Sequence, residues 1–499
     1  MQKRAPFLRV NRLPHRSQKD NPAMPASNKD EQPSSGSVRL ARRIIGVILD
    51  GFGVLLVLLL LVIILQLTVM LQAARQANAP SKISLCRKGN TLTTCHSAMP
   101  RQSFSAVKET GVLRIFIVGS SQAMGSPYVH QEFNHISSFF PNEGGLATWL
   151  EDYLSFAMPK RHIEIINVAK ANGSKTASNL DILREILAKG SPDIIVIMDG
   201  NNERVDNGHI RVNNSAQRDA VATVIYPAYQ LTIQTMAREA TTAGVRTIFV
   251  TLPSNLRDWP PETRSDRELF ERLFRDITTE PYDGGRKHRP VLEAACRDLR
   301  SQWPQIQGNS AAHFSLARCL EYEGKIEQAR SEYIAARDLD YCFVRVRSVQ
   351  NEFIRALRGP GVSVVDLEAL MRGYAYDGIP GNDLFHDYCH MNLRGNKISG
   401  FEIARKVLQL EGVPMHDEEL RQAPLRHINH RGLWWLYWYQ TVKWTLYRFL
   451  PSSWQQLGLR GRPIADGFCQ AMREIDKVEW PINLLRKNGE NGAQPEGAK

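Results

Sequence analysis

Short apolar runs rich in β-branched residues alternate with helical stretches between residues 113 and 365, and this pattern constrains the fold most. The runs cover 113–118, 163–168, 194–198, 247–252 and 362–365. Helical periodicity lies between them, as over 178–188, where leucine and isoleucine side chains share one face. Strands that alternate with helices predict a parallel sheet covered on both faces. We therefore expect a three-layer α/β/α sandwich.

The alternation stops over 262–357, where amphipathic helices and no convincing strand are expected. Residues 311–336 fit one tetratricopeptide-like helical hairpin, with Gly324 at its turn. A single repeat cannot bury its own face, so it should pack against neighbouring helices or a protein partner. We interpret 262–357 as a helical insert that divides the α/β domain into 111–261 and 358–412.

An apolar segment near the N-terminus predicts a membrane anchor over 44–71. Gly51 to Leu71 is almost wholly apolar and long enough to cross a bilayer of ~30 Å. Three arginines between 39 and 43 precede it, so we expect the N-terminus in the cytoplasm and the rest of the chain outside. A signal peptide cleaved after 77–79 is the alternative, but its basic leader and apolar run would both be unusually long.

The flanking segments carry most of the positive charge and many aromatic residues. Residues 1–43 hold ten Lys or Arg against three Asp or Glu, out of a net charge of +12, and are expected to be disordered. Residues 72–110 are interpreted as an extracytoplasmic stalk. Residues 413–499 combine an aromatic-rich helical region with a disordered tail. The aromatic cluster at 433–454 fits a membrane-interface helix, a carbohydrate-stacking surface or a helix packed on the core. No zinc-finger, RNP or helix-turn-helix signature is present, so nucleic acid is not an expected partner.

The chain has seven cysteines, none of them at CxxC spacing, so a zinc site is not expected. Cys86 and Cys95 flank a short polar loop and could form a disulfide in an oxidising compartment. The odd count leaves at least one thiol without a partner in the chain. Cys389 is expected to pack beside the site described next.

Three polar segments follow strand ends or lie in a late loop. Ser121 directly follows the first apolar run, and Asn202 follows the run 194–198. Active sites of open α/β sheets collect at the carboxyl ends of strands. Serine needs a base and a group that orients the base. We therefore predict Ser121 as nucleophile, His390 as base and Asp387 as the group that orients His390.

An attacked ester also needs donors for its oxyanion. The candidates are the amide of Ser121, an amide of the loop 171–173 and the side-chain amide of Asn202. Each segment has a simpler interpretation as well. The serine loop could be a plain turn or a phosphate cradle, and the loop 200–203 could cap a helix, with Glu203 at the helix start.

Together these residues resemble the conserved blocks of the SGNH (GDSL-like) hydrolase superfamily. The resemblance covers about 110–410 and implies a flavodoxin-like three-layer α/β/α sandwich. It also implies Ser121 as nucleophile, Gly173 and Asn202 as oxyanion donors, and Asp387 with His390 as the Asp-x-x-His pair. Two features depart from the family. Ser120 replaces the usual Asp before the nucleophile and could itself compete for that role. The second block has no early glycine, so Asn172 could take the place assigned to Gly173.

A metal hydrolase is the competing chemical class. Asp383, His386, Asp387 and His390 form a run rich in possible ligands. However, Gly and Pro residues at 378–381 favour a loop, and the chain lacks the HExxH motif of zincins. We therefore expect neither a metal nor a cofactor.

The sequence thus predicts a single-pass membrane protein with a serine esterase domain outside the cytoplasmic membrane. Its substrate would be an acylated glycan or a lipid ester. An O-acyltransferase of cell-envelope or exported glycans would use the same triad and is one alternative. A catalytically silent, membrane-tethered scaffold, with a protein partner at the helical insert, is another.

Overall fold

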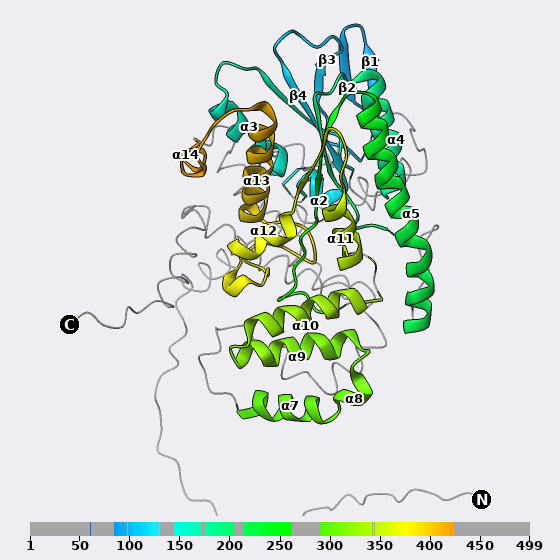
Figure 1. Cartoon of the computed structure of the whole chain (residues 1–499), viewed down its shortest axis with the longest axis vertical. Coiled ribbons are helices and arrows are strands. Elements are labelled where there is room, and N and C mark those ends of the chain that lie inside the picture. Colours follow the sequence, from blue (N-terminus) through cyan, green and yellow to red (C-terminus); the bar gives the residue numbers. More distant parts are fainter. Residues whose placement is uncertain are drawn as a thin grey trace, which may run out of the picture. The chain divides into compact units, whose positions relative to one another are not determined.

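The computed structural model describes residues 84–423 except 97, 127, 130–143, 171–174, 204–211, 213, 262–289, 342 and 344, together with Leu60 (Figure 1). The rest of the predicted membrane span and the aromatic cluster at 433–454 lie outside the described residues. Within the described part, none of the helices combines the length and the apolar character needed to cross a membrane.

Five parallel strands form the central sheet, in the order β5-β4-β6-β7-β8. Their bounds are β4 (Leu113–Gly119), β5 (Ile163–Asn167), β6 (Ile194–Met198), β7 (Arg246–Val250) and β8 (Val362–Val365). The predicted strands are confirmed, although β7 begins and ends slightly earlier than its apolar run. The chain passes from β5 across β4 to β6. The carboxyl ends of β4 and β6 therefore flank the switch point at which doubly wound sheets bind ligands.

Helices cover both faces of this sheet (Figure 1). Alternate residues of a strand point to opposite faces, so Ile115 and Ile117 enter one core whereas Phe116 and Val118 enter the other. The first core is closed by α3 (Leu146–Ala157), α12 (Leu367–Tyr374), α13 (Leu393–Glu411) and α14 (Asp417–Arg421). The second is closed by α4 (Thr176–Lys189), α5 (Ser215–Thr242) and α11 (Ser348–Ala356). The predicted α/β fold with a parallel sheet is confirmed.

Residues 85–105 form a small antiparallel sheet rather than part of a stalk. It consists of β1 (Leu85–Lys88), β2 (Thr91–Thr94) and β3 (Ser103–Ser105). Leu85 and Leu92 are buried in the second core, and Glu185 of α4 accepts hydrogen bonds from the amides of Ser84 (2.7 Å) and Leu85 (3.1 Å). The predicted stalk over 72–110 is therefore wrong for this part, because its few apolar side chains pack against the α/β domain. The expected Cys86–Cys95 disulfide is present.

The described part of the insert contains α7 (Pro290–Ser301), α8 (Trp303–Ile306), α9 (Ser310–Tyr322) and α10 (Ile326–Leu339), and no strand. Helices α9 and α10 lie side by side (Figure 1) and pack Phe314 against Tyr333. A second disulfide, Cys296–Cys319, joins α7 to α9 and was not predicted. Helix α11 contributes Ile354 to the second core. Helix α11 therefore belongs to the α/β domain, and the insert ends before it. The sequence predicts a later boundary, at 357. The likeness to a tetratricopeptide repeat stays a prediction.

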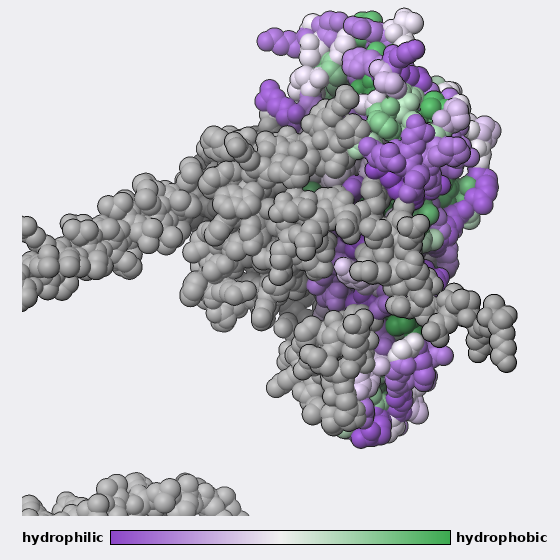
Figure 2. Space-filling model, turned by 90° about the vertical axis from the view of Figure 1, so that its left-hand side faces the viewer, coloured by the Kyte–Doolittle hydropathy of each residue, from purple (hydrophilic) through white to green (hydrophobic). Residues whose placement is uncertain are grey.

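The described surface is mainly hydrophilic on the face shown in Figure 2, with apolar residues in small patches. Large apolar side chains that are exposed are few in the described domain, among them Val107, Val224 and Leu231. The buried apolar side chains of this part lie in the two cores of the α/β domain and in smaller clusters of the insert.

Gly119, the last residue of β4, has the least room of the glycines that the structure describes. A Cβ atom there would lie 2.1 Å from the carbonyl oxygen of Met198 and 2.7 Å from the Cβ of Ala123. We predict that Gly119→Ala lowers the free energy of unfolding by about 1–3 kcal/mol or more, as overpacking does. Gly373→Ala is the control, because nothing lies within 4 Å of a Cβ at that position in α12. Chemical denaturation of both variants tests this, and equal stabilities would contradict it.

Candidate active site

Ser121, His390 and Asp387 form a continuous hydrogen-bonded chain. Ser121 is the first residue of α2 (Ser121–Met124), directly beyond β4. Its Oγ lies 2.8 Å from Nε2 of His390, and Nδ1 of His390 lies 2.6 Å from Oδ2 of Asp387. A carboxylate only accepts hydrogen bonds, so Nδ1 carries the proton and Nε2 is left to accept from the Ser121 hydroxyl. This is the arrangement of a serine nucleophile with an oriented base.

Asp387 is held by its own loop. Its Oδ1 accepts hydrogen bonds from the amides of Cys389 (2.9 Å) and His390 (2.7 Å). Burial raises the pKa of Asp387, but the His390 imidazole and these donors outweigh burial and lower it. Burial likewise lowers the pKa of His390, yet the Asp387 carboxylate outweighs burial and raises it well above 6.5. The pair therefore favours an ionised carboxylate and a strongly basic imidazole.

A second histidine braces the same loop from behind. The amide of His386 donates to the carbonyl oxygen of His390 (2.8 Å), and its Nε2 lies 2.5 Å from the hydroxyl of Tyr128. Burial lowers the pKa of His386 to about 3. A neutral, buried imidazole that is bonded to Tyr128 is not the base. It ties the loop of His390 to the segment that follows the nucleophile.

The oxyanion donors are described in part. The amide of Ser121 is the first of α2 and has no helical partner. Asn202 follows β6 and is 6% exposed, and its side-chain amide makes no hydrogen bond to another described residue. Gly173 and Asn172 lie outside the described residues. Ser120 is buried, and the base bonds to Ser121, which favours Ser121 as nucleophile.

The loop that carries Asn202 begins in a buried acidic pair. Asn179 of α4 donates to Oδ2 of Asp199 (2.6 Å), and the amide of Thr176 donates to Oε1 of Glu203 (2.9 Å). Burial, together with the charge of Glu203, raises the pKa of Asp199 to about 7. Glu203 thus accepts from the first turn of α4. The residues that directly follow it lie outside the described residues, so the expectation that it starts a helix stays a prediction.

The residues of the metal alternative have other partners. The oxygens of Asp383 accept from the amides of Tyr376 and Gly381, both at 2.9 Å. Within the described residues, the group that gathers possible ligand atoms is Asp387, Cys389 and His390. Burial raises the pKa of the Cys389 thiol, and a protonated thiol is a poor ligand. The geometry therefore favours the triad over a metal centre.

Two residues that sequence reasoning missed connect the segments of the site. Nδ2 of Asn201 donates to Oε1 of Gln122 (2.5 Å), and Nε2 of Gln122 donates to the carbonyl oxygen of Pro253 (3.1 Å). Their positions beside Ser121 and Asn202 were the available signal. Their partners, however, are distant in the sequence and could not be read from it.

No family model matches the chain, and no curated protein matches it. Solved structures that resemble it include a lipase/acylhydrolase from Enterococcus faecalis, with 16% identity, 60% of this chain and 96% of that chain covered, and a TM-score of 0.26. A GDSL-like lipase from Bacteroides thetaiotaomicron has 13% identity, 60% and 88% coverage, and a TM-score of 0.22. An α/β hydrolase from the metagenome of Lake Arreo in Spain has 14% identity, 61% and 97% coverage, and a TM-score of 0.26. At such low values the likeness indicates nothing about the reaction, so the chemistry rests on the side chains themselves.

The electrostatics of the pair can be tested by NMR titration of the imidazoles. We predict that His390 titrates well above pH 6.5 and that Asp387→Asn lowers the pKa of His390, because burial remains while the attraction to the Asp387 carboxylate is lost. His386 should stay neutral down to about pH 3 in both proteins. A raised folded pKa means that the pair adds stability below the ordinary histidine pKa and loses it as pH rises through the folded pKa. Titration of wild-type His390 at or below pH 6.5 would contradict this account.

Proposed function

We propose that this chain is a serine esterase of SGNH type that hydrolyses acyl esters outside the cytoplasmic membrane. One observation carries the proposal: Ser121 Oγ, His390 and Asp387 form a hydrogen-bonded chain with distances of 2.8 and 2.6 Å. The side-chain amide of Asn202, at the neighbouring strand end, supports the proposal as a donor to the oxyanion.

The proposed reaction proceeds in two steps. Ser121 Oγ attacks the acyl carbon while Nε2 of His390 takes its proton, and the carbonyl oxygen becomes the oxyanion. The ester C–O bond then breaks, and His390 returns the proton to the leaving alcohol. In the second step water attacks the acyl-enzyme, again with His390 as base, and the acid leaves as Ser121 is restored. A sugar hydroxyl in place of that water would give the O-acyltransferase alternative.

One observation and one prediction from the sequence support an extracytoplasmic site. The disulfides Cys86–Cys95 and Cys296–Cys319 lie in the same part of the chain as the triad, and disulfides persist in oxidising compartments. The predicted membrane span over 44–71 would tether this part beside the membrane. We therefore propose an acylated envelope or exported glycan, or a lipid ester, as the substrate.

A fluorophosphonate probe tests the proposal most simply. Wild type should be labelled once per chain, and both Ser121→Ala and His390→Ala should abolish labelling. Folded wild type that stays unlabelled would overturn the proposal and favour the scaffold alternative. Ser120→Ala should retain labelling, since the base contacts Ser121.

Assays with two classes of substrate then distinguish a glycan esterase from a lipid esterase. Release of acetate from acetylated glycans, lost in Ser121→Ala and absent with phospholipid vesicles, is the result expected for a glycan esterase. The reverse profile indicates a lipid esterase. Transfer of the acyl group to added oligosaccharide, in preference to water, would replace the hydrolase by the acyltransferase.

A further inference from the structure

The chain leaves the helical hairpin after α10 and re-enters the α/β domain in α11. We call residues 340–351 the return segment. Several of its polar side chains are buried: Asp340, Arg345, Arg347, Gln350 and Asn351. Buried polar groups are costly unless they are hydrogen-bonded. The partners of these side chains therefore indicate what the segment holds in place.

Gln350 holds the loop that carries the oxyanion donor. Its Nε2 donates to the carbonyl oxygen of Gly200 at 3.0 Å, and its Oε1 accepts from the amide of Arg347 at 3.0 Å. The two contacts together fix which end of the side-chain amide faces Gly200, because a flipped amide would place two acceptors together at Gly200 and two donors together at Arg347. The amide of Val346 also donates to Oδ1 of Asn201 (3.0 Å). Asn202 follows directly.

Gly200 has little freedom at this contact. Its φ is +135°, and a Cβ atom would lie 3.2 Å from the ring of Tyr229 and 3.4 Å from Nε2 of Gln350. The Tyr229 hydroxyl donates to the carbonyl oxygen of Asp199 (3.2 Å). The peptides on both sides of Gly200 are thus bonded, one to Tyr229 and one to Gln350.

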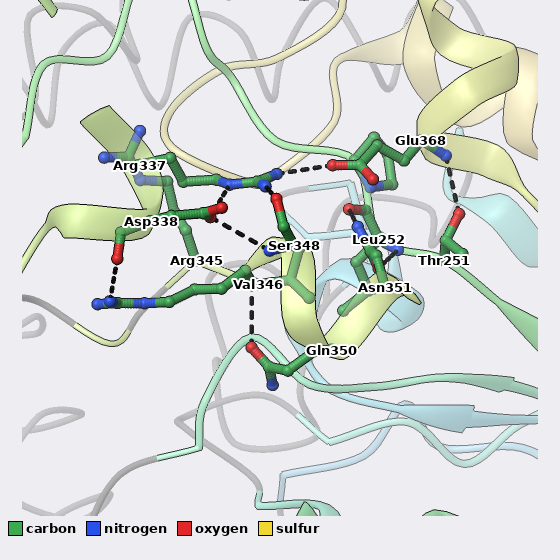
Figure 3. A network of polar contacts seen from close by, with 12 residues as sticks. Thr251, Leu252, Arg337, Asp338, Arg345, Val346, Ser348, Gln350, Asn351 and Glu368 are labelled. Carbon is green, nitrogen blue, oxygen red and sulfur yellow. Dashed lines mark hydrogen bonds and ion pairs between the residues drawn. The ribbon is translucent and has the colours of Figure 1, made fainter. Parts of the chain in front are cut away.

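The return segment is also connected, through the turn beyond Leu252, to the loop that carries His390. Arg345 pairs with Asp340 (3.0 Å) and donates to the carbonyl oxygen of Trp259 (3.2 Å). Figure 3 shows Asn351 facing Leu252, with which it exchanges hydrogen bonds of 2.9 and 3.0 Å. The turn beyond Leu252 contacts the loop of His390, since the amide of Asn255 donates to the carbonyl oxygen of Tyr388 (3.1 Å).

We propose that Gln350 is a positioning residue for catalysis, which holds the loop 200–202 so that the Asn202 amide stays aimed at the oxyanion. The return segment, which joins the helical insert to the α/β domain, is then part of the catalytic framework, because it supplies this side chain. This proposal rests on the proposed esterase function.

The anchoring of the segment itself is a separate network. Arg337 donates to Glu368 (2.7 Å) and to Oγ of Ser348 (2.9 Å), as Figure 3 shows. Ser348 lies two residues before Gln350 on α11, and among the described residues it bonds to Arg337 and Asp338 rather than to the loop 200–202. Ser348→Ala is therefore a matched control, because it removes one hydrogen bond of the return segment, to Arg337, and leaves the contact between Gln350 and Gly200 in place.

The test compares Gln350→Glu and Gln350→Met with Ser348→Ala and wild type. Both Gln350 variants remove the donor to Gly200 at similar side-chain volume. Hydrolysis of p-nitrophenyl acetate is measured per active site, and active sites are counted by the end point of fluorophosphonate labelling. Unfolded protein therefore does not lower the measured kcat. We expect kcat of both Gln350 variants to fall about ten- to a hundred-fold, less than the 10²–10³ typical of losing a donor outright. KM and the pH midpoint set by His390 should change little.

Amide hydrogen exchange of residues 199–203 supplies a readout that needs no activity. It should quicken in the Gln350 variants and stay at the wild-type rate in Ser348→Ala, which should retain wild-type kcat. Wild-type kcat and exchange in the Gln350 variants would overturn the proposal, as would equal losses in Ser348→Ala. Wild type that is neither labelled nor active would overturn the proposed function instead, and the exchange rates then judge the role of Gln350 separately.

Discussion

The carboxylate of Asp387 is the group around which the site is organised. It is buried and can only accept hydrogen bonds, so the residues that follow it in the chain have to supply donors to both of its oxygens. The amides of Cys389 and His390 bind one oxygen, and Nδ1 of His390 binds the other. The imidazole is left with one orientation, in which Nε2 faces Ser121. Without Asp387, burial alone would lower the pKa of His390 and weaken the base.

The topology of the sheet brings the remaining groups to this base. Ser121 and Asn202 follow β4 and β6, which are neighbours in the sheet, so the nucleophile and the proposed oxyanion donor meet at the switch point. The insert lies between β7 and β8 in the sequence and is bonded to the turn beyond β7. Arg257 of that turn forms a buried ion pair of 2.7 Å with Glu321 of α9. Insert and site are therefore joined by charges that would be costly to separate.

The sequence predicts the sheet well and its accessories poorly, for physical reasons. Buried parallel strands are continuous apolar runs, so all five are visible in the sequence. Ser121, Asp387 and His390 are recognisable because their spacing and place beside strand ends or in a late loop suit a serine base. Strands β1 to β3 are short and polar, and their burial depends on α4. The roles of Gln350 and Tyr128 depend on contacts between segments 150 and 258 residues apart, which no local pattern records.

We propose that Ser121 and Asn202 act on one carbonyl group, with His390 as base. A crystal structure of the fluorophosphonate adduct would show whether they do. We expect phosphorus bonded to Ser121 Oγ, with the phosphonyl oxygen within hydrogen-bonding distance of the Ser121 amide and of Nδ2 of Asn202. A phosphonyl oxygen that points away from Asn202, or an adduct on any residue other than Ser121, would contradict it.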